Sequence, residues 1–447
     1  IGSLSGGGNV TVPSGSFGLT VNAGGGIGLG AFSGSFSGAG FLTVQDGGLK
    51  LSGNNTNTGG LTLNRGTLVL DYSGGATNIV PNTGALTLAG GTLLLKGGTT
   101  GDSAASTTLN AGASFIGAPS VLGVPDTSRL NLAAITRTVA GSTLHVMGGA
   151  AATSTSNVSG ILGGYATIGA GYLGESWAVA NGAGAAMTAL PAGSYTANVW
   201  SGTNHTDVVT SIPAATGTTQ TVRFNTAAAN TVTLTGNATV TSGGILVTES
   251  VGNNLSTITT GGAFTLAGLG TTDLILHQYN AYNSLLLDVA LPAGATGITK
   301  AGPGTVILSR DNVATGAVMI GAGGTLQVGN GGTTGSLTTG AVTNLGVLSF
   351  NRSNATAMAN GMNGGGWLIQ EGAGALTLSG ASASFSGRIS VKNGSIIITR
   401  NTSVGAALSG VAGISSVENG ATYDLGNGTD ILGSATIAEG IILKGGT

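Results

Sequence analysis

The chain has 447 residues, of which only 28 are charged (13 Lys and Arg, 15 Asp and Glu), and its net charge is −2. No basic stripe accompanies this balance, so the sequence offers no electrostatic footprint for nucleic acid or for an anionic membrane surface. With 41% hydrophobic residues it is unlike charge-rich disordered chains, and we expect it to fold without disulfides because cysteine is absent. No run reaches the 18 or so apolar residues of a membrane helix.

Residues 1–115 introduce the strand pattern of the chain. Short runs of alternating Leu, Val, Ile and Thr are bounded by Gly, Asn or Ser, which is typical of β-strands separated by turns. The 86 glycines cluster between these runs, where turns need positive φ, and follow no Gly-X-Y period. The clearest example is a phrase of three runs, Leu49–Leu51, Leu61–Leu63 and Leu68–Leu70.

Residues 116–297 form a second, less regular zone that we also predict to be β-structure. It gathers bulky aromatic residues, and we expect an irregular coil or loop around them. If they are exposed on one face, they offer flat platforms for sugar rings or a partner surface; if they are buried, they fill a wider coil. The residues proposed for glycan or partner contact are Tyr172, Trp177, Tyr195 and Trp200.

Residues 298–447 repeat the phrase twice in quick succession. The runs are Val306–Leu308, Val318–Ile320 and Leu326–Val328, then Leu376–Leu378, Ile389–Val391 and Ile396–Ile398. In all three phrases the third run begins about 20 positions after the first, a spacing within the range of stacked repeats.

This fixed period predicts stacked coils of about 19–20 residues, and therefore an all-β parallel solenoid. A β-sandwich is the competing all-β architecture, but its strands need no coil period and its core usually carries more large aromatic side chains than the 4% found here. In a solenoid each Leu, Ile or Val lies above its equivalent in the previous coil, which suits small aliphatic residues.

Residues 47–68, 302–309 and 365–380 resemble the autotransporter-associated β-strand repeat. The resemblance implies a right-handed parallel β-helix, exported to the exterior or cell surface of a diderm bacterium. The motif says little about activity, because passengers of this kind include adhesins, fibres and some enzymes. The first residues lack an initiator Met and a charged leader, so we expect a mature or excised part of something longer.

Candidate catalytic and metal-binding residues are few. Asp424 and Asp430 flank a Gly-Asn-Gly turn, and exposed turn residues are the simpler interpretation than a cation site. His145, His205 and His277 lack metal-ligand spacing; His205 and Asp207 share a strand face and can meet there. The glycine run at 24–30 lacks the Lys and the helix of a phosphate loop. We therefore predict a protein that is not an enzyme, with no cofactor and no metal.

Asparagines at turns are the more informative polar residues. Stacked identical amides can donate to the coil above and accept from the coil below, which satisfies polar groups that are costly to bury. The candidates for such ladders are Asn54, Asn55, Asn253, Asn254 and Asn312.

Taken together, the sequence predicts a structural or adhesive extracellular rod. The strand-like terminal residues Ile1, Leu4, Ile441, Ile442 and Leu443 are candidate stacking ends for a head-to-tail fibre, because a solenoid exposes open strand edges unless it is capped. Its expected partners are other copies of itself, a host or neighbouring cell surface, or a glycan. The alternative is a lectin-like or polysaccharide-acting protein on the same fold.

Overall fold

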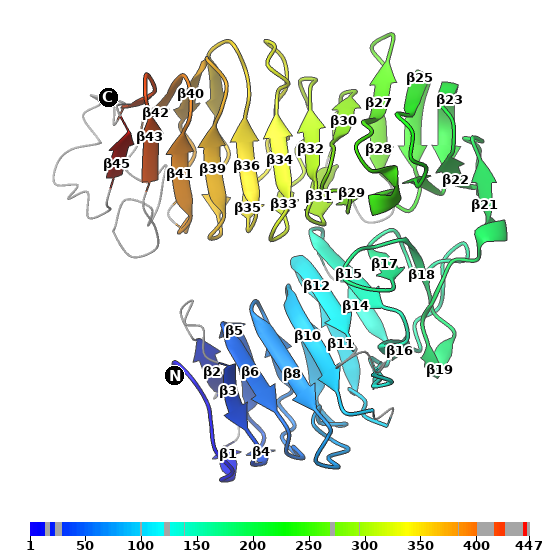
Figure 1. Cartoon of the computed structure of the whole chain (residues 1–447), viewed down its shortest axis with the longest axis vertical. Helices are drawn as coiled ribbons and strands as arrows, with labels where there is room; N and C mark the ends of the chain where they lie inside the picture. The colour runs from blue at the N-terminus through cyan, green and yellow to red at the C-terminus, as the bar shows by residue number, and fades with distance from the viewer. Residues whose placement is uncertain are drawn as a thin grey trace. The chain divides into compact units, whose positions relative to one another are not determined.

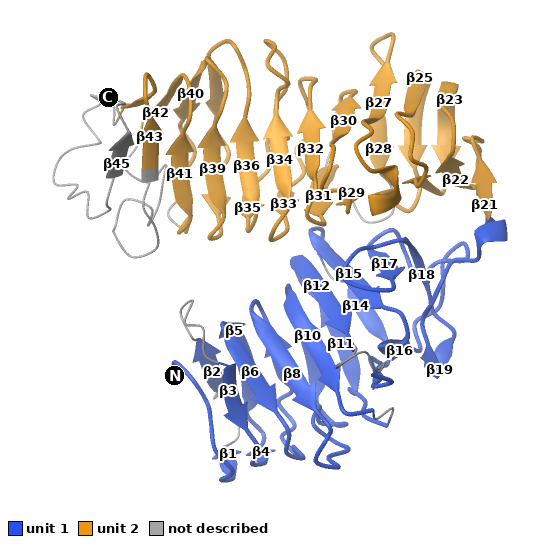
Figure 2. Cartoon of the chain, viewed as in Figure 1, with its two compact units in different colours: residues 1–194 blue, residues 195–447 orange. Residues whose placement is uncertain are grey.

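The computed structural model describes residues 1–13, 18–22, 29–98, 101–119, 126–137, 139–268, 273–294, 296–382, 384–399, 415–424 and 441–444. The fold is all-β, about 2% helical, and its parallel stacked coils form a β-solenoid of about 17 turns (Figure 1). The predicted fold class is confirmed. The chain divides into two compact units, Ile1–Ser194 and Tyr195–Thr447 (Figure 2).

The described residues of unit 1 form two main sheets and two smaller ones. The larger sheet runs, in spatial order, β20 (Thr188–Ala189), β18 (Ser176–Val179), β17 (Ala166–Gly169), β15 (Ser142–Met147), β12 (Gly112–Gly117), β10 (Gly91–Lys96), β8 (Thr67–Asp71), β6 (Gly48–Leu51) and β3 (Leu29–Phe32). The second runs β14 (Ile135–Arg137), β11 (Ser106–Leu109), β9 (Ala85–Leu88), β7 (Leu61–Leu63), β5 (Phe41–Asp46) and β2 (Gly18–Asn22). The smaller sheets are β13 (Leu130–Asn131), β16 (Ala151–Thr153) and β19 (Gly182–Ala186), and β1 (Val10–Val12) with β4 (Phe36–Gly38); the short 3₁₀ helix η1 (Ala192–Ser194) follows.

In unit 2, the part of the chain that the structure describes forms three sheets. The first runs β21 (Tyr195–Ala197), β22 (His205–Val208), β24 (Thr221–Phe224), β26 (Gly244–Val247), β29 (Asp273–Gln278), β31 (Gly297–Ala301), β33 (Val318–Ile320), β35 (Val342–Asn344) and β38 (Met362–Asn363). The second runs β23 (Ile212–Thr219), β25 (Thr231–Val240), β27 (Ser256–Thr260), β30 (Leu285–Asp288), β32 (Thr305–Leu308), β34 (Thr325–Val328), β36 (Val347–Phe350), β39 (Trp367–Gln370), β41 (Arg388–Val391), β43 (Ser415–Glu418) and β45 (Ile441–Lys444), with β28 (Leu266–Gly268) beside β25. The third runs β37 (Thr356–Met358), β40 (Ala375–Leu378), β42 (Ser395–Ile398) and β44 (Thr422–Asp424), and η2 (Glu249–Val251) is a 3₁₀ turn.

The strand register shows that the recurring phrase does set the coil. Leu49 pairs with Leu68, Val306 with Leu326 and Leu376 with Ile396, each in the adjacent coil. Elsewhere the coil length departs from the spacing of the phrase. The coil is shorter between the paired residues His205 and Thr221, and much longer between Gly244 and Ile275. The long coil holds, besides its turns, the 3₁₀ helix η2 and the extra strand β28, which pairs with β25.

The core consists of columns of aliphatic side chains along the solenoid. Period-2 alternation directs every second residue of a strand inward, and the parallel register places it above its equivalent. Each fully buried Leu or Ile contributes roughly 1.5–3 kcal/mol relative to an exposed one. One such column in unit 1, every member of which is buried, is Leu49, Leu68, Leu93, Ile116, Val146 and Ile168.

A polar residue stands four positions after the first run of the phrase in all three repeats, and in the first two repeats it clamps both neighbouring coils. Asn55, the fourth residue after Leu51, accepts a hydrogen bond from Phe36 N of the preceding coil at 2.8 Å and donates to Ile79 O of the following coil at 2.7 Å. Asn312, in the same position, accepts from Leu291 N at 2.8 Å and donates to Ser336 O at 2.5 Å. Ser382 accepts from Met362 N at 3.0 Å.

The predicted ladder of identical Asn side chains is therefore corrected. Asn55 and Asn312 do connect coils, but their partners are backbone groups, because the equivalent positions of the neighbouring coils are not Asn. The Asn54 carboxamide oxygen likewise accepts from Thr77 N and Asn78 N. Asn254 bonds locally to Val251 O.

The parallel coils of unit 1 end in reversed strands. β18 pairs antiparallel with β17 and with β20, and β19 pairs antiparallel with β16. A strand that turns back occupies the open edge of the last parallel strand without adding a coil. Sequence reasoning did not predict this ending, since β19 is a run of Gly and Ala with no apolar alternation.

Candidate functional site

The four predicted contact aromatics divide between the two units. Tyr172 and Trp177 belong to unit 1, and Tyr195 and Trp200 belong to unit 2. Trp177 is fully buried, and Trp200, 9% exposed, packs into the core of unit 2. These two indoles thus follow the buried interpretation and offer no exposed platform. Tyr195 is half-buried, and Tyr172 is 58% exposed.

Tyr172 lies on an aromatic column along the outward face of the larger sheet of unit 1. Its ring stacks on Phe115 with 4.6 Å between centroids, and Phe115 stacks on His145 at 5.5 Å. Phe115 points outward because its neighbour Ile116 belongs to the inward column. His145 Nε2 bonds to Gly171 O at 2.9 Å, so the residues after β17 pack against this aromatic column.

The His145 ring is bonded at both nitrogens. A carbonyl only accepts, so Nε2–H donates to Gly171 O, and Nδ1 lies 3.1 Å from the Thr167 hydroxyl. Burial lowers the pKa of His145, although hydrogen bonds to the backbone of Gly171 and Thr167 act in the opposite direction. The imidazole therefore anchors the loop that carries Tyr172.

Tyr195 belongs to a charged cluster at the start of unit 2. The Arg223 guanidinium lies 3.5 Å from the centroid of the Tyr195 ring and grips Asp207 with two hydrogen bonds, at 2.9 and 2.7 Å. Burial acts to lower the pKa of Arg223, but the hydrogen bonds to Asp207 and the charges of Tyr195 and Asp207 leave it raised. His205 and Asp207 share a face as predicted, yet both oxygens of Asp207 bond Arg223, and His205 Nδ1 bonds Thr221 Oγ1 at 3.0 Å.

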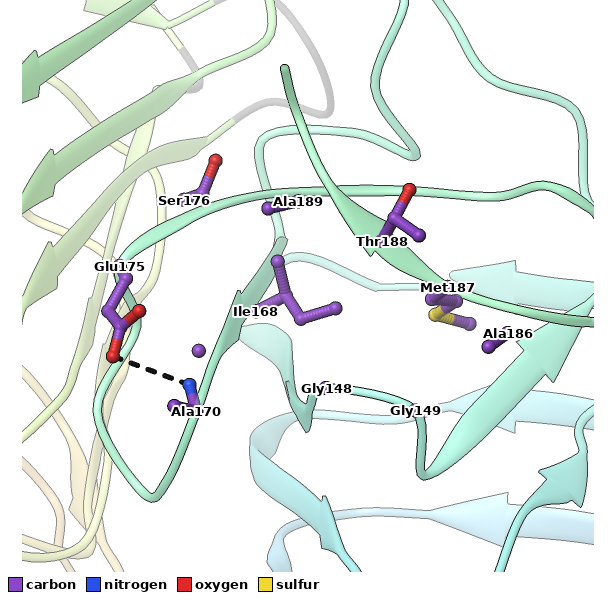
Figure 3. Close-up of a pocket in the computed structure, with 11 residues that line it drawn as sticks. Gly148, Gly149, Ile168, Ala170, Glu175, Ser176, Ala186, Met187, Thr188 and Ala189 are labelled. Atoms are coloured by element: carbon purple, nitrogen blue, oxygen red, sulfur yellow. Dashed lines mark hydrogen bonds between the residues drawn. The ribbon is translucent and has the colours of Figure 1, made fainter. Parts of the chain in front are cut away.

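A pocket of about 480 Å³ opens beside the reversed strands of unit 1 (Figure 3). Its floor is Ile168, and Met187 forms part of its wall. The polar groups at its margin are the Ser176 and Thr188 hydroxyls and the Glu175 carboxylate, which accepts a hydrogen bond from Ala170 N at 3.3 Å. Glycine and alanine supply most of the remaining lining. The walls are suited to a small, largely apolar group with one hydrogen-bonding edge.

The structure does not bring the remaining candidate residues together into a site among the residues that it describes. Asp424 ends β44, while Asp430 and residues 24–28 of the glycine run lie outside the described residues. Across the part of the chain that the structure describes, no three His, Cys, Asp or Glu residues are close enough together to hold a metal ion.

Of the candidate stacking ends, Ile1 and Leu4 precede the first strand, whereas Ile441, Ile442 and Leu443 lie within a strand. The Ile1 amino group donates to Thr20 O at 2.9 Å, and Asn22 N donates to Ile1 O, so the first residue lies against β2. The Ile1 side chain is 59% exposed, and Leu4 packs partly against the core. Ile441, Ile442 and Leu443 form β45, which pairs with β43. Whether these ends stack stays a prediction.

Sequence reasoning missed an exposed tryptophan–arginine pair on the second sheet of unit 2. Trp367 is 38% exposed, and the Arg388 guanidinium carbon lies 5.2 Å from the centroid of its ring. The two residues are directly paired across β39 and β41. The coil period would have revealed the pair, since Arg388 follows Trp367 at close to the spacing that stacks one coil on the next.

A buried lysine was missed as well. Lys300 is fully buried in β31, on the same face as the core residue Ile298. Its Nζ donates to Ala301 O at 3.0 Å and to Gly302 O at 2.7 Å, and burial lowers its pKa to about 7. Gln370, the equivalent residue of the third repeat, donates to Gly372 O and Gly374 O, both at 2.8 Å. Both side chains therefore satisfy corner carbonyls inside the solenoid.

Comparison with known proteins identifies one repeat. The model of the passenger-associated-transport-repeat matches residues 38–70, 298–328 and 368–398. The matched segments correspond to β5–β8, β31–β34 and β39–β42, so each covers four consecutive strands. No curated protein and no solved structure matches the chain. Within the described residues, no helix is both long enough and apolar enough to cross a membrane.

Proposed function

This chain carries the autotransporter-associated passenger repeat on a β-solenoid, a combination that fits an autotransporter passenger domain, and from this premise we propose a non-catalytic structural or adhesive role outside the cell. The observation that carries the proposal is that each of the three matched repeats coincides with four consecutive strands of the solenoid. The sequence elements that match the repeat are thus elements that build the stacked coils. A rigid, nearly neutral solenoid suits extension and contact.

The proposal includes head-to-tail association of copies. Parallel coils leave strand edges at the ends of a solenoid, and such edges pair with other strands unless they are covered. At one end of unit 1 the last strands, β2 and β3, are covered by the first residues, because Asn22 N donates to Ile1 O and Ser33 N donates to Gly6 O; residues 1–6 therefore form the outermost edge there, and β45 stands last in the order of its sheet in unit 2. A contact between unlike ends does not close on itself, so repetition of it produces a fibre.

Electron microscopy of the purified chain over a range of concentrations tests this association. The expected result is filaments that lengthen with concentration, and that shorten when Leu4 and Leu443 are both replaced by Lys, since charge blocks edge pairing. The double substitution Tyr282→Lys with Val313→Lys, at exposed sites of unit 2, is the control for added charge alone. Monomers at every concentration would remove the fibre from the proposal and leave adhesion as the role.

Adhesion is tested separately by cell binding. Latex beads coated with the chain should attach to host or neighbouring bacterial cells more than beads coated with a heat-unfolded sample. Equal attachment of both samples would contradict an adhesive role for the folded solenoid.

A lectin-like passenger is the second candidate. It is favoured by Tyr172, whose exposed ring is already held flat on Phe115 and therefore loses little freedom on binding. Replacement of Tyr172 by Ala should then weaken binding to an immobilised glycan array, with the exposed Tyr282→Ala variant as the control. An array signal that neither substitution changes would exclude the Tyr172 surface.

A further inference from the structure

The outward face of the second sheet in unit 2 carries a straight column of side chains across β32, β34, β36, β39 and β41, which lie side by side in Figure 1. The strand register pairs its members one coil after another. At a strand spacing of about 4.8 Å, the five residues span about 19 Å. The column comprises Thr305, Thr325, Val347, Trp367 and Arg388.

This column is accessible, whereas its neighbours in sequence are not. The inward residues Leu326, Leu348 and Leu368 are fully buried, so the alternation of the strands directs the column outward. Trp367 is 38% exposed and Arg388 is exposed, and the other three members are half-buried. The Trp367 side chain is the only exposed Trp among the described residues.

The guanidinium of Arg388 is oriented by Trp367 and has no ion-pair partner among the residues that the structure describes. It lies 5.2 Å from the centroid of the Trp367 ring, which restrains its rotation. No acceptor for its side-chain N–H groups occurs within the described residues. In contrast, Arg223 and Arg310 each grip an aspartate with two hydrogen bonds. Arg388 therefore presents a planar fork of donors to solvent.

A planar fork beside an apolar ring matches the chemistry of an acidic sugar. Guanidinium binds carboxylate through two parallel hydrogen bonds, and the C–H face of a pyranose packs against an aromatic side chain. The Thr305 and Thr325 hydroxyls continue the line at the spacing of the coils. Their position suits the hydroxyl groups of further sugar units rather than a second negative charge.

We propose that this column, which we call the Trp367–Arg388 ladder, is a binding site for a carboxylate-bearing polysaccharide, with the acid on Arg388 and the ring against Trp367. An extended glycan fits better than a compact anion because the accessible residues form a line. The proposal deepens the adhesive function by naming a ligand class, and it rests on that proposed function. Its test uses purified protein, so a negative result leaves export and fibre formation untouched.

The test is calorimetric titration of the full chain with an oligogalacturonate of defined length, and with the same oligomer after reduction of its carboxyl groups. Binding of the acidic oligomer that weakens by about tenfold or more in Trp367→Ala, and likewise in Arg388→Gln, would support the site. Arg388→Lys keeps the charge but loses the fork, and should fall between the wild type and Arg388→Gln. Affinity should also decrease with added salt.

Matched controls separate the ladder from surface effects. Tyr282→Ala removes an exposed aromatic side chain of the same unit, and Lys392→Gln removes an exposed positive charge that is paired with Glu371. Both should bind as the wild type does. The proposal is overturned if the acidic oligomer does not bind, if the reduced oligomer binds equally well, or if the controls weaken binding as much as the ladder variants.

Discussion

Asn55 and Asn312 lie in different units, far apart in the sequence, and make the same pair of hydrogen bonds. Each accepts from a backbone N–H of the preceding coil and donates to a backbone C=O of the following coil. Both stand four residues after the end of the first run of the phrase, Asn55 after Leu51 and Asn312 after Leu308. The repeat thus encodes a hydrophobic stack and a polar clamp together.

Replacement of Asn312 by Ala should destabilise the coils around it. The buried groups Leu291 N and Ser336 O lose their partner, and each unsatisfied group costs about 1–3 kcal/mol. Hydrogen exchange followed by mass spectrometry should show faster exchange in β30, β32 and β34. Asn253→Ala, at an exposed position, should leave exchange unchanged. Equal protection in both variants would contradict the clamp.

Leu326→Ala should produce a cavity in the stacked column of unit 2. Leu326 is fully buried between Val306 and Leu348, and such truncations cost about 2–5 kcal/mol. The midpoint of urea unfolding, followed by circular dichroism, should fall. The neighbouring change Gln327→Ala removes an outward side chain and should shift the midpoint much less; similar shifts for both would contradict the inward assignment of Leu326.

Lys300 should make stability depend on pH. Burial lowers its pKa from 10.5 in the unfolded chain to about 7 in the folded one, so between these values the unfolded state binds one more proton. Stability therefore rises as the pH increases from about 7 to about 10.5, by at most about 5 kcal/mol.

The Lys300→Gln variant tests this dependence, since Gln370 fills the equivalent corner with an uncharged donor. The difference in unfolding free energy between the variant and the wild type should be largest near pH 7 and shrink toward pH 10.5. A difference that stays constant over this range would show that Lys300 does not titrate with folding.

Asp102 should be essential to the fold of unit 1. It is fully buried, and its Oδ2 accepts from Tyr72 Oη, Ile79 N and Val80 N, at 2.9, 3.0 and 2.9 Å. Burial raises the pKa of Asp102, and these three hydrogen bonds, together with one from Ser103 N to Oδ1, act against that rise. Asp102→Ala leaves buried N–H groups unpaired, which should cost roughly 3 kcal/mol or more, whereas Tyr72→Phe removes one bond and should cost about 1.5–3 kcal/mol.

Thermal unfolding followed by circular dichroism measures both substitutions. The expected order of melting temperatures is wild type, then Tyr72→Phe, then Asp102→Ala. A Tyr72→Phe variant that melts below Asp102→Ala would show that the phenol, and not the carboxylate, holds the segment Tyr72–Val80.

The solenoid was predictable because its stabilising groups repeat. A column such as Leu49 above Leu68 requires one residue type at one spacing, and the sequence displays that spacing directly. The sequence indicated the residue that forms the clamp but not the groups to which it bonds. Asn55 was identified as a coil-bridging residue, but its backbone partners depend on corner geometry that composition does not specify.

The candidate sites were harder to predict because they depend on burial. Trp177 and Trp200 are aromatic residues in an irregular zone, and only the packing of the folded unit shows that they are buried. Trp367 was read solely as part of a repeat, although the coil period placed Arg388 beside it. Lys300 lies two residues after Ile298 and therefore on the same inward face of β31. Buried lysines are so rare that the alternation of apolar residues did not indicate one here.

Labelling of intact cells with a membrane-impermeant amine reagent, followed by mass spectrometry, tests the central claim most directly. For a folded passenger outside the cell, the half-exposed Lys96 and Lys392 side chains should be labelled on intact cells, while the buried Lys300 is labelled only after denaturation. Lys96 and Lys392 that react only after the cells are lysed would contradict an extracellular solenoid.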